Sequence, residues 1–128
     1  MKRTASGPSR SSCRRATRER LGGAQIAAIG ALSGATLAFF DWETKKYQPI
    51  PVREQVEVAS LIGDIAIGPD GKPSVHAHAV LGRRDGTALA GHLQEAHVRP
   101  TLEIIVTELP AHLCKAKDTE SGLALIRV

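Results

Sequence analysis

Aromatic and cysteine side chains are scarce in this chain of 128 residues. The aromatic residues are Phe39, Phe40, Trp42 and Tyr47. With so few rings, we expect a core of aliphatic side chains in one domain of modest size. The two cysteines, Cys13 and Cys114, lie far apart and match neither a disulfide framework nor a zinc-finger spacing. Their pattern suits a reducing compartment, so we predict a cytoplasmic location.

Charged residues are absent from residues 21–40. This run is long enough to cross a membrane or to act as an export signal. Its four glycines make it weakly hydrophobic and a poor helix former, so we expect no membrane segment. The Ser33-Gly34 pair instead predicts a turn between two buried strands, at about residues 25–32 and 35–41.

The excess of positive charge is confined to the N-terminal end. Residues 1–20 carry seven basic side chains and one acidic side chain, a net charge of +6, whereas residues 21–128 carry ten and twelve, a net charge of −2. We predict a disordered basic tail over residues 1–20 and a folded domain over residues 21–128. Any attraction to DNA then belongs to the tail, although such a tail can also serve only to keep a chain soluble. The candidate nucleic-acid-binding residues are Lys2, Arg3, Arg10, Arg14, Arg15, Arg18 and Arg20.

Strand patterns dominate the rest of the chain. We expect strands at about residues 47–52, 55–67, 75–81, 87–98, 101–109 and 122–128. The first of these holds Pro49 and Pro51 and should lie at a sheet edge, and Pro100 should end another strand. Gly68–Lys72 predicts a turn, and residues 110–120 predict a loop or a short helical turn. The expected class is α/β (α+β), with a largely antiparallel sheet and few helices.

Residues 75–92 predict a β-hairpin closed by an Asp-Gly turn. Gly86 suits the left-handed last position of a three-residue loop, which would pair Arg83 with Thr87. A two-residue Asp85-Gly86 loop would shift the register by one residue and reverse the faces of one strand. We favour the three-residue loop.

In that register three histidines converge on one face of the hairpin. His78 lies opposite His92, and alternation places His76 on the same side as His78. Three imidazoles without a fourth protein ligand form an open divalent-metal site, in which water completes a Zn²⁺ tetrahedron. The alternative is a set of polar residues on a half-exposed sheet face. We predict that His76, His78 and His92 bind Zn²⁺ or another divalent metal.

Other polar residues are weaker candidates for this site. Glu95, Glu103 and Arg83 are possible helpers in catalysis, but alternation directs Glu95 to the face opposite His92. His97 also falls on the opposite face, and His112 follows Pro110 in a loop. We expect both of these histidines to be ordinary surface residues.

With these elements in place, the chain resembles the plant-and-prokaryote-conserved (PPC) domain family. The resemblance is collinear and rests on residues 25–33, 39–41, 57–65, 76–79, 91–93 and 100–103. It implies an α/β domain built on a largely antiparallel sheet that assembles as a homotrimer. In plants the domain accompanies an AT-hook and mediates protein association in the nucleus, and bacterial members are provisionally called DNA-binding proteins.

Two departures from the family pattern limit what can be carried over. The family normally opens with a strand and a helix before the segment that matches residues 24–32, and the tail does not resemble them, so we expect an N-terminally truncated domain. The Arg-Gly-Arg-Pro core of an AT-hook is also missing from the sequence. The PPC fold is similar to that of acetolactate decarboxylase, a zinc enzyme with a strand-borne H-x-H pair and a later histidine, and this fold-level analogy favours metal binding at His76, His78 and His92.

Two functions follow from the sequence. The first is a homotrimeric interaction or regulatory module that contacts DNA through its basic tail. The second is a zinc-dependent lyase or hydrolase that uses the three histidines. The sequence holds no nucleophile elbow, phosphate-binding glycine loop or dinucleotide fingerprint, and no catalytic residue is assigned. On the family resemblance we favour the first function, and we keep an enzymatic activity as the less favoured alternative.

Overall fold

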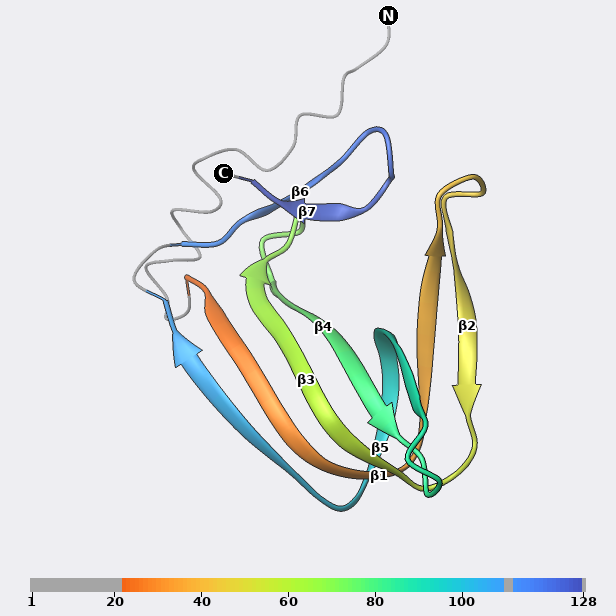
Figure 1. Ribbon diagram of the computed structural model, residues 1–128. Coiled ribbons are helices and arrows are strands. Elements are labelled where there is room, and N and C mark those ends of the chain that lie inside the picture. Colours follow the sequence, from red (N-terminus) through yellow and green to blue (C-terminus); the bar gives the residue numbers. More distant parts are fainter. Residues whose placement is uncertain (1–21, 110–111, 128) are drawn as a thin grey trace, which may run out of the picture. The chain divides into compact units, whose positions relative to one another are not determined.

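The computed structural model describes residues 22–109 and 112–127, which form strands and turns without a helix (Figure 1). The strands are β1 (Ala24–Asp41), β2 (Lys46–Val52), β3 (Val56–Ile67), β4 (Pro73–Gly82), β5 (Ala88–Glu108), β6 (Lys115–Lys117) and β7 (Ala124–Ile126). A five-stranded sheet has the order β2-β1-β3-β4-β5, and β1 also pairs with β5. The β1–β2, β4–β5 and β6–β7 pairs are antiparallel. The predicted fold class, a largely antiparallel sheet with few helices, is confirmed, and the described residues include no helix able to span a membrane.

The uncharged run after residue 21 forms one strand and not two. β1 continues through Ser33 and Gly34 to Asp41, so the predicted turn at this pair was wrong. Figure 1 shows β1 as a single strongly curved ribbon. Its second half, from Ala35 to Asp41, pairs with β2, and the strand also pairs with β3 and β5. Pairing with other strands takes up backbone hydrogen bonds of β1, which favours a continuous strand over a turn.

Two glycines allow β1 and β5 to approach each other closely. A Cβ atom on Gly30, whose φ is 154°, would lie 2.3 Å from the carbonyl oxygen of Thr101. A Cβ atom on Gly91 would lie 2.9 Å from the carbonyl oxygen of Ala38. β5 passes through a cis Arg99–Pro100 peptide without interruption, so the predicted strand end at Pro100 was also wrong. Because β1 borders β5 beyond this proline, the strand has a partner there and continues.

The core is aliphatic, as the scarcity of aromatic residues predicts. The largest fully buried side chains are Leu32, Leu37, Val56 and Leu81. The aromatic residues instead gather on the β1–β2 hairpin, where Phe39 and Trp42 are exposed. β2 pairs with β1 at the end of the sheet, which confirms its predicted edge position.

The chain divides into two compact units. One contains Gln25–Asp64 and His76–Thr107, which make up most of the five-stranded sheet. The other contains Ile65–Val75 and residues near both chain ends. In this second unit the predicted turn is confirmed, because the Gly68 N–H donates to the Lys72 carbonyl at 2.8 Å.

The C-terminal part of the second unit differs from the prediction in three ways. The segment expected to be a loop contains β6, which pairs with β7, and β7 is shorter than the strand expected over residues 122–128. Cys114 is disulfide-bonded, although the cysteine spacing matched no disulfide framework. The predicted basic tail, residues 1–20, lies outside the described residues.

Candidate metal centre

The β4–β5 hairpin has the register that its turn predicts. The Arg83 N–H donates to the Thr87 carbonyl at 2.8 Å, and Gly86 adopts a φ of 83°. These two features define the three-residue loop at positions 84–86. His78 is consequently paired with His92 across the strands, which confirms the predicted alignment.

The loop is held by a side chain at its centre. Asp85 accepts hydrogen bonds from the Thr87 hydroxyl at 2.6 Å and from the Thr87 N–H at 3.0 Å. These bonds, with the hydroxyl contributing most, hold the pKa of the exposed Asp85 carboxyl below its ordinary value. They favour the ionised carboxylate, so this support is present at neutral pH and is lost as the pH falls through the lowered pKa. The loop therefore fixes the register that brings His92 opposite His78.

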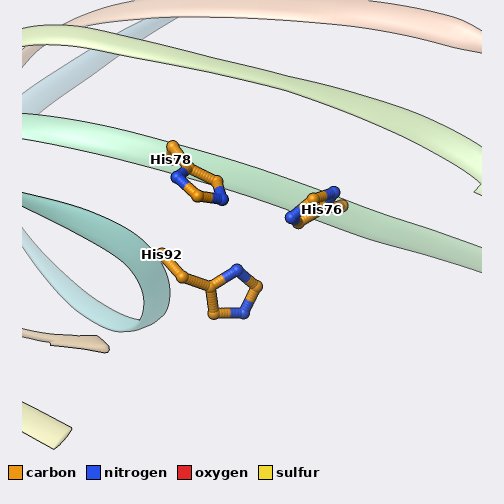
Figure 2. A group of neighbouring side chains, drawn as sticks. All are labelled: His76, His78 and His92. Carbon is orange, nitrogen blue, oxygen red and sulfur yellow. The ribbon is translucent and has the colours of Figure 1, made fainter. Parts of the chain in front are cut away.

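The structure brings the three predicted ligands together, as Figure 2 shows. One nitrogen from each of His76, His78 and His92 lies within 4.8 Å of the other two. The ring centres are separated by 5.2 Å for His76–His78, 5.2 Å for His76–His92 and 5.5 Å for His78–His92. His78 is exposed, whereas His76 and His92 are partly buried. Among the described residues this is the group of side chains with metal-binding geometry.

The donor set suits a divalent metal that keeps an open coordination position. Nitrogen ligands of one tetrahedral zinc ion, at about 2.0–2.1 Å from it, lie about 3.3 Å from one another. If side-chain rotations moved each ring by about an ångström, the three nitrogens would reach that spacing. Three imidazoles leave one position of the tetrahedron for water or another oxygen donor, and imidazole also suits copper, iron and nickel.

Asp64 is a neighbour of the site that the sequence interpretation missed. Its Oδ2 lies 3.6 Å from Nδ1 of His76, and its side chain is mostly buried. A signal was available in the sequence. The turn pairs Gly68 with Lys72, and counting back along an antiparallel pair from there places Asp64 opposite His76.

Tyr47 is a second neighbour that sequence reasoning did not find. Its ring stacks on His92, with ring centres 4.6 Å apart and an angle of 24° between the planes. Tyr47 also packs against Phe40, which it faces across β1 and β2, and Phe40 contacts Trp42. No local pattern indicates the contact between Tyr47 and His92, because it joins an edge strand to a hairpin that is distant in the sequence.

The proposed helpers in catalysis do not join the histidines. Arg83 donates to Glu54 at 2.8 Å. Glu95 forms an ion pair with His97, whose side chain is 67% exposed. Glu103 lines a groove beside Ile104, and His112 is exposed and packs next to Gly22. His97 and His112 lie outside the three-histidine group, as expected.

The structure places this protein in the class of β-sheet domains that carry a three-histidine site on one hairpin. The family model of the Plants and Prokaryotes Conserved (PCC) domain matches residues 11–110. The chain therefore belongs to this family, which confirms the resemblance seen in the sequence.

Solved structures show the same fold. A plant- and prokaryote-conserved protein from Pyrococcus horikoshii is 35% identical, with a TM-score of 0.78 over 90% of this chain and 79% of that one. A metal-containing protein from Archaeoglobus fulgidus is 32% identical, with a TM-score of 0.77 over 93% of this chain and 84% of that one. A proposed DNA-binding protein from Ralstonia eutropha JMP134 is 33% identical, with a TM-score of 0.77 over 90% of this chain and 79% of that one. No curated protein sequence matches the chain.

Proposed function

We propose that this protein is a self-associating PPC-domain module that binds one divalent metal ion, preferably Zn²⁺, through His76, His78 and His92. The observation that carries the proposal is the convergence of three ring nitrogens to within 4.8 Å on a hairpin of defined register. The relationship to a metal-containing protein of the same fold from Archaeoglobus fulgidus supports it. The neighbouring Asp64 and Tyr47 add contacts of the kind that orient metal-binding imidazoles.

Elemental analysis tests the metal directly. Purified protein dialysed against trace Zn²⁺ is expected to retain one zinc per chain and to lose it to a strong chelator. Because neutral imidazole is the ligand, protons compete with the metal and retention should weaken as the solution is made acidic. Retention of less than a tenth of an equivalent at pH 7.5 would contradict the proposal.

Self-association is supported by an apolar groove of about 390 Å³ between β1, β3 and β5. Ile29, Ile62, Ile104 and Ile105 line it and are each more than half exposed. Contiguous exposed apolar surface of this kind is typical of an interface between proteins. We propose that copies of the chain cover this groove in the homotrimer that the family resemblance implies.

Sedimentation equilibrium at micromolar concentration is expected to give three times the monomer mass. Ile104→Lys should shift the population toward monomer, because a charge in a buried apolar interface is not compensated. Val75→Lys, at an exposed valine outside the groove, should leave the mass unchanged. A wild-type protein that sediments as a folded monomer would rule out the trimer.

DNA contact through the basic tail is a second proposed property. The tail carries a net charge of +6 whereas the rest of the chain carries −2, and the Ralstonia relative is a proposed DNA-binding protein. Binding should be independent of DNA sequence and should fall steeply with salt as phosphate counterions are released. Deletion of residues 2–20 is expected to abolish it in a fluorescence-anisotropy titration with duplex DNA. Binding that survives the deletion would place the DNA site in the domain.

The alternative function is a zinc-dependent lyase or hydrolase. The open coordination position that three histidines leave is the feature that favours it, since a bound metal ion can act as a Lewis acid there. His78 is exposed, so this position is within reach of small molecules.

The cytoplasmic location stays a proposal from the sequence. The disulfide at Cys114 removes the support that the cysteine spacing gave to it.

A further inference from the structure

We propose that Asp64 is a positioning residue of the metal site, which holds the proton of His76 on Nδ1 and so presents Nε2 to the metal. This inference rests on the proposed metal-binding function and assigns a role to a residue outside the ligand set. It starts from the ion-pair contact of 3.6 Å between Asp64 Oδ2 and His76 Nδ1.

The backbone places these two side chains on the same face of the sheet. A Cβ atom on Gly63 would lie 2.3 Å from the carbonyl oxygen of His76 and 2.9 Å from Cα of Ala77. The backbones of β3 and β4 therefore pass too close here for a side chain to fit between them. This contact agrees with the register set by the Gly68–Lys72 turn, in which Asp64 faces His76. Asp64 therefore reaches His76 from a rigid strand and not from a flexible loop.

The two ring nitrogens of His76 then have different tasks. Nδ1 faces the Asp64 carboxylate, and in Figure 2 one nitrogen of His76 lies on the side of the other two rings while the second points away from them. A carboxylate accepts a hydrogen bond from a nitrogen that carries a proton and repels a nitrogen that presents a lone pair. It therefore selects the tautomer of His76 with the proton on Nδ1. Nε2 is the nitrogen left with a lone pair for the metal.

Partial burial strengthens the effect. The Asp64 side chain is 23% exposed, so its charge is screened less than that of a surface carboxylate. The separation exceeds a normal hydrogen bond, and a shift of less than about 1 Å in either side chain would bring the pair within bonding distance. Carboxylate–histidine–metal arrangements of this kind fix the ring orientation and raise the basicity of the ligand.

The test measures both the proton position and the metal affinity. Long-range ¹H–¹⁵N spectra of the metal-free full chain at pH 8 should show the His76 proton on Nδ1, and added Zn²⁺ should bind at Nε2. In Asp64→Asn the Nδ1-protonated population should fall, and zinc affinity in a chelator competition should weaken by about 10–100-fold. Asp64→Ser serves as the second variant if Asp64→Asn does not fold.

A matched control is available on β5. Glu95 also forms an ion pair with a histidine on its own strand, His97, at 3.2 Å, but that pair is exposed and outside the site. Glu95→Gln should change neither zinc affinity nor the spectrum of His76. Zinc bound to Nδ1 of His76 in the wild-type protein, or an unchanged tautomer and affinity in Asp64→Asn, would overturn the inference. If the wild-type protein binds no zinc, the proposed function fails, while the metal-free spectra still decide the role of Asp64.

Discussion

Replacing His92 with alanine is expected to lower the affinity for Zn²⁺ by more than about 100-fold, beyond the range typical of residues that only support a ligand. The reason is the coordination number. Without His92, only His76 and His78 of the three-histidine group remain, and the ion would be held largely by water. Titration calorimetry or competition with a chromophoric chelator at pH 7.5 measures the loss. His76→Ala and His78→Ala should have effects of the same size.

His97→Ala provides the control for this series. His97 lies on the same strand as His92, but its side chain is exposed and forms an ion pair with Glu95. The variant should bind zinc with wild-type affinity. Equal losses in His97→Ala and His92→Ala would mean that the hairpin does not present the three-histidine face in solution.

The largest effect on stability is expected from Gly63→Ala. The added methyl group would lie 2.3 Å from the carbonyl oxygen of His76, a distance that Cβ atoms do not tolerate. The obstacle is backbone, so β3 and β4 would have to separate locally. Overpacking of this kind costs about 1–3 kcal/mol in the free energy of unfolding, and the lost strand pairing would add to it. Urea denaturation at fixed protein concentration measures the change.

Gly82→Ala is the matched control, because it is also a glycine within a strand. A Cβ atom there would meet its nearest neighbour, the carbonyl oxygen of Glu57, at 3.9 Å, which is ordinary contact. We expect this variant to be as stable as the wild type or slightly more stable, since alanine reduces the freedom of the unfolded chain. If both variants had equal stability, the close packing of β3 on β4 at Gly63 would be wrong. Gly63→Ala should also weaken zinc binding, since it displaces the backbone of His76.

The residue preferences of one local turn explain why the three histidines of the candidate site could be predicted from the sequence. Gly86 and Asp85 define the loop by their own conformational and hydrogen-bonding preferences, and a loop of three residues sets the register of the whole hairpin. From that register the pairing of His78 with His92 follows by counting. The position of His76 follows from the two-residue period of a strand.

The errors arose where pairing with distant strands overrode local signals. Ser33-Gly34 and Pro100 are typical of turns and strand ends, yet β1 and β5 run through them because each has a neighbour there. Glycine at position 30 is required by contact with Thr101, a residue far along the chain, and not by a turn. Propensity over a few residues cannot show such a contact.

The sequence by itself determined the sheet-rich class, the aliphatic core, the family and the face that carries His76, His78 and His92. Each of these depends on composition, on alternation or on a turn whose residues are adjacent in the chain. The Gly68–Lys72 turn places Asp64 opposite His76 by counting, and only the tertiary structure decided that Tyr47 stacks on His92. The contact between Tyr47 and His92 joins strands that are distant in sequence, and its existence depends on how the sheet curves and which strands become neighbours. The three candidate ligands are thus fixed by one local hairpin, whereas their surroundings are fixed by the packing of the whole sheet.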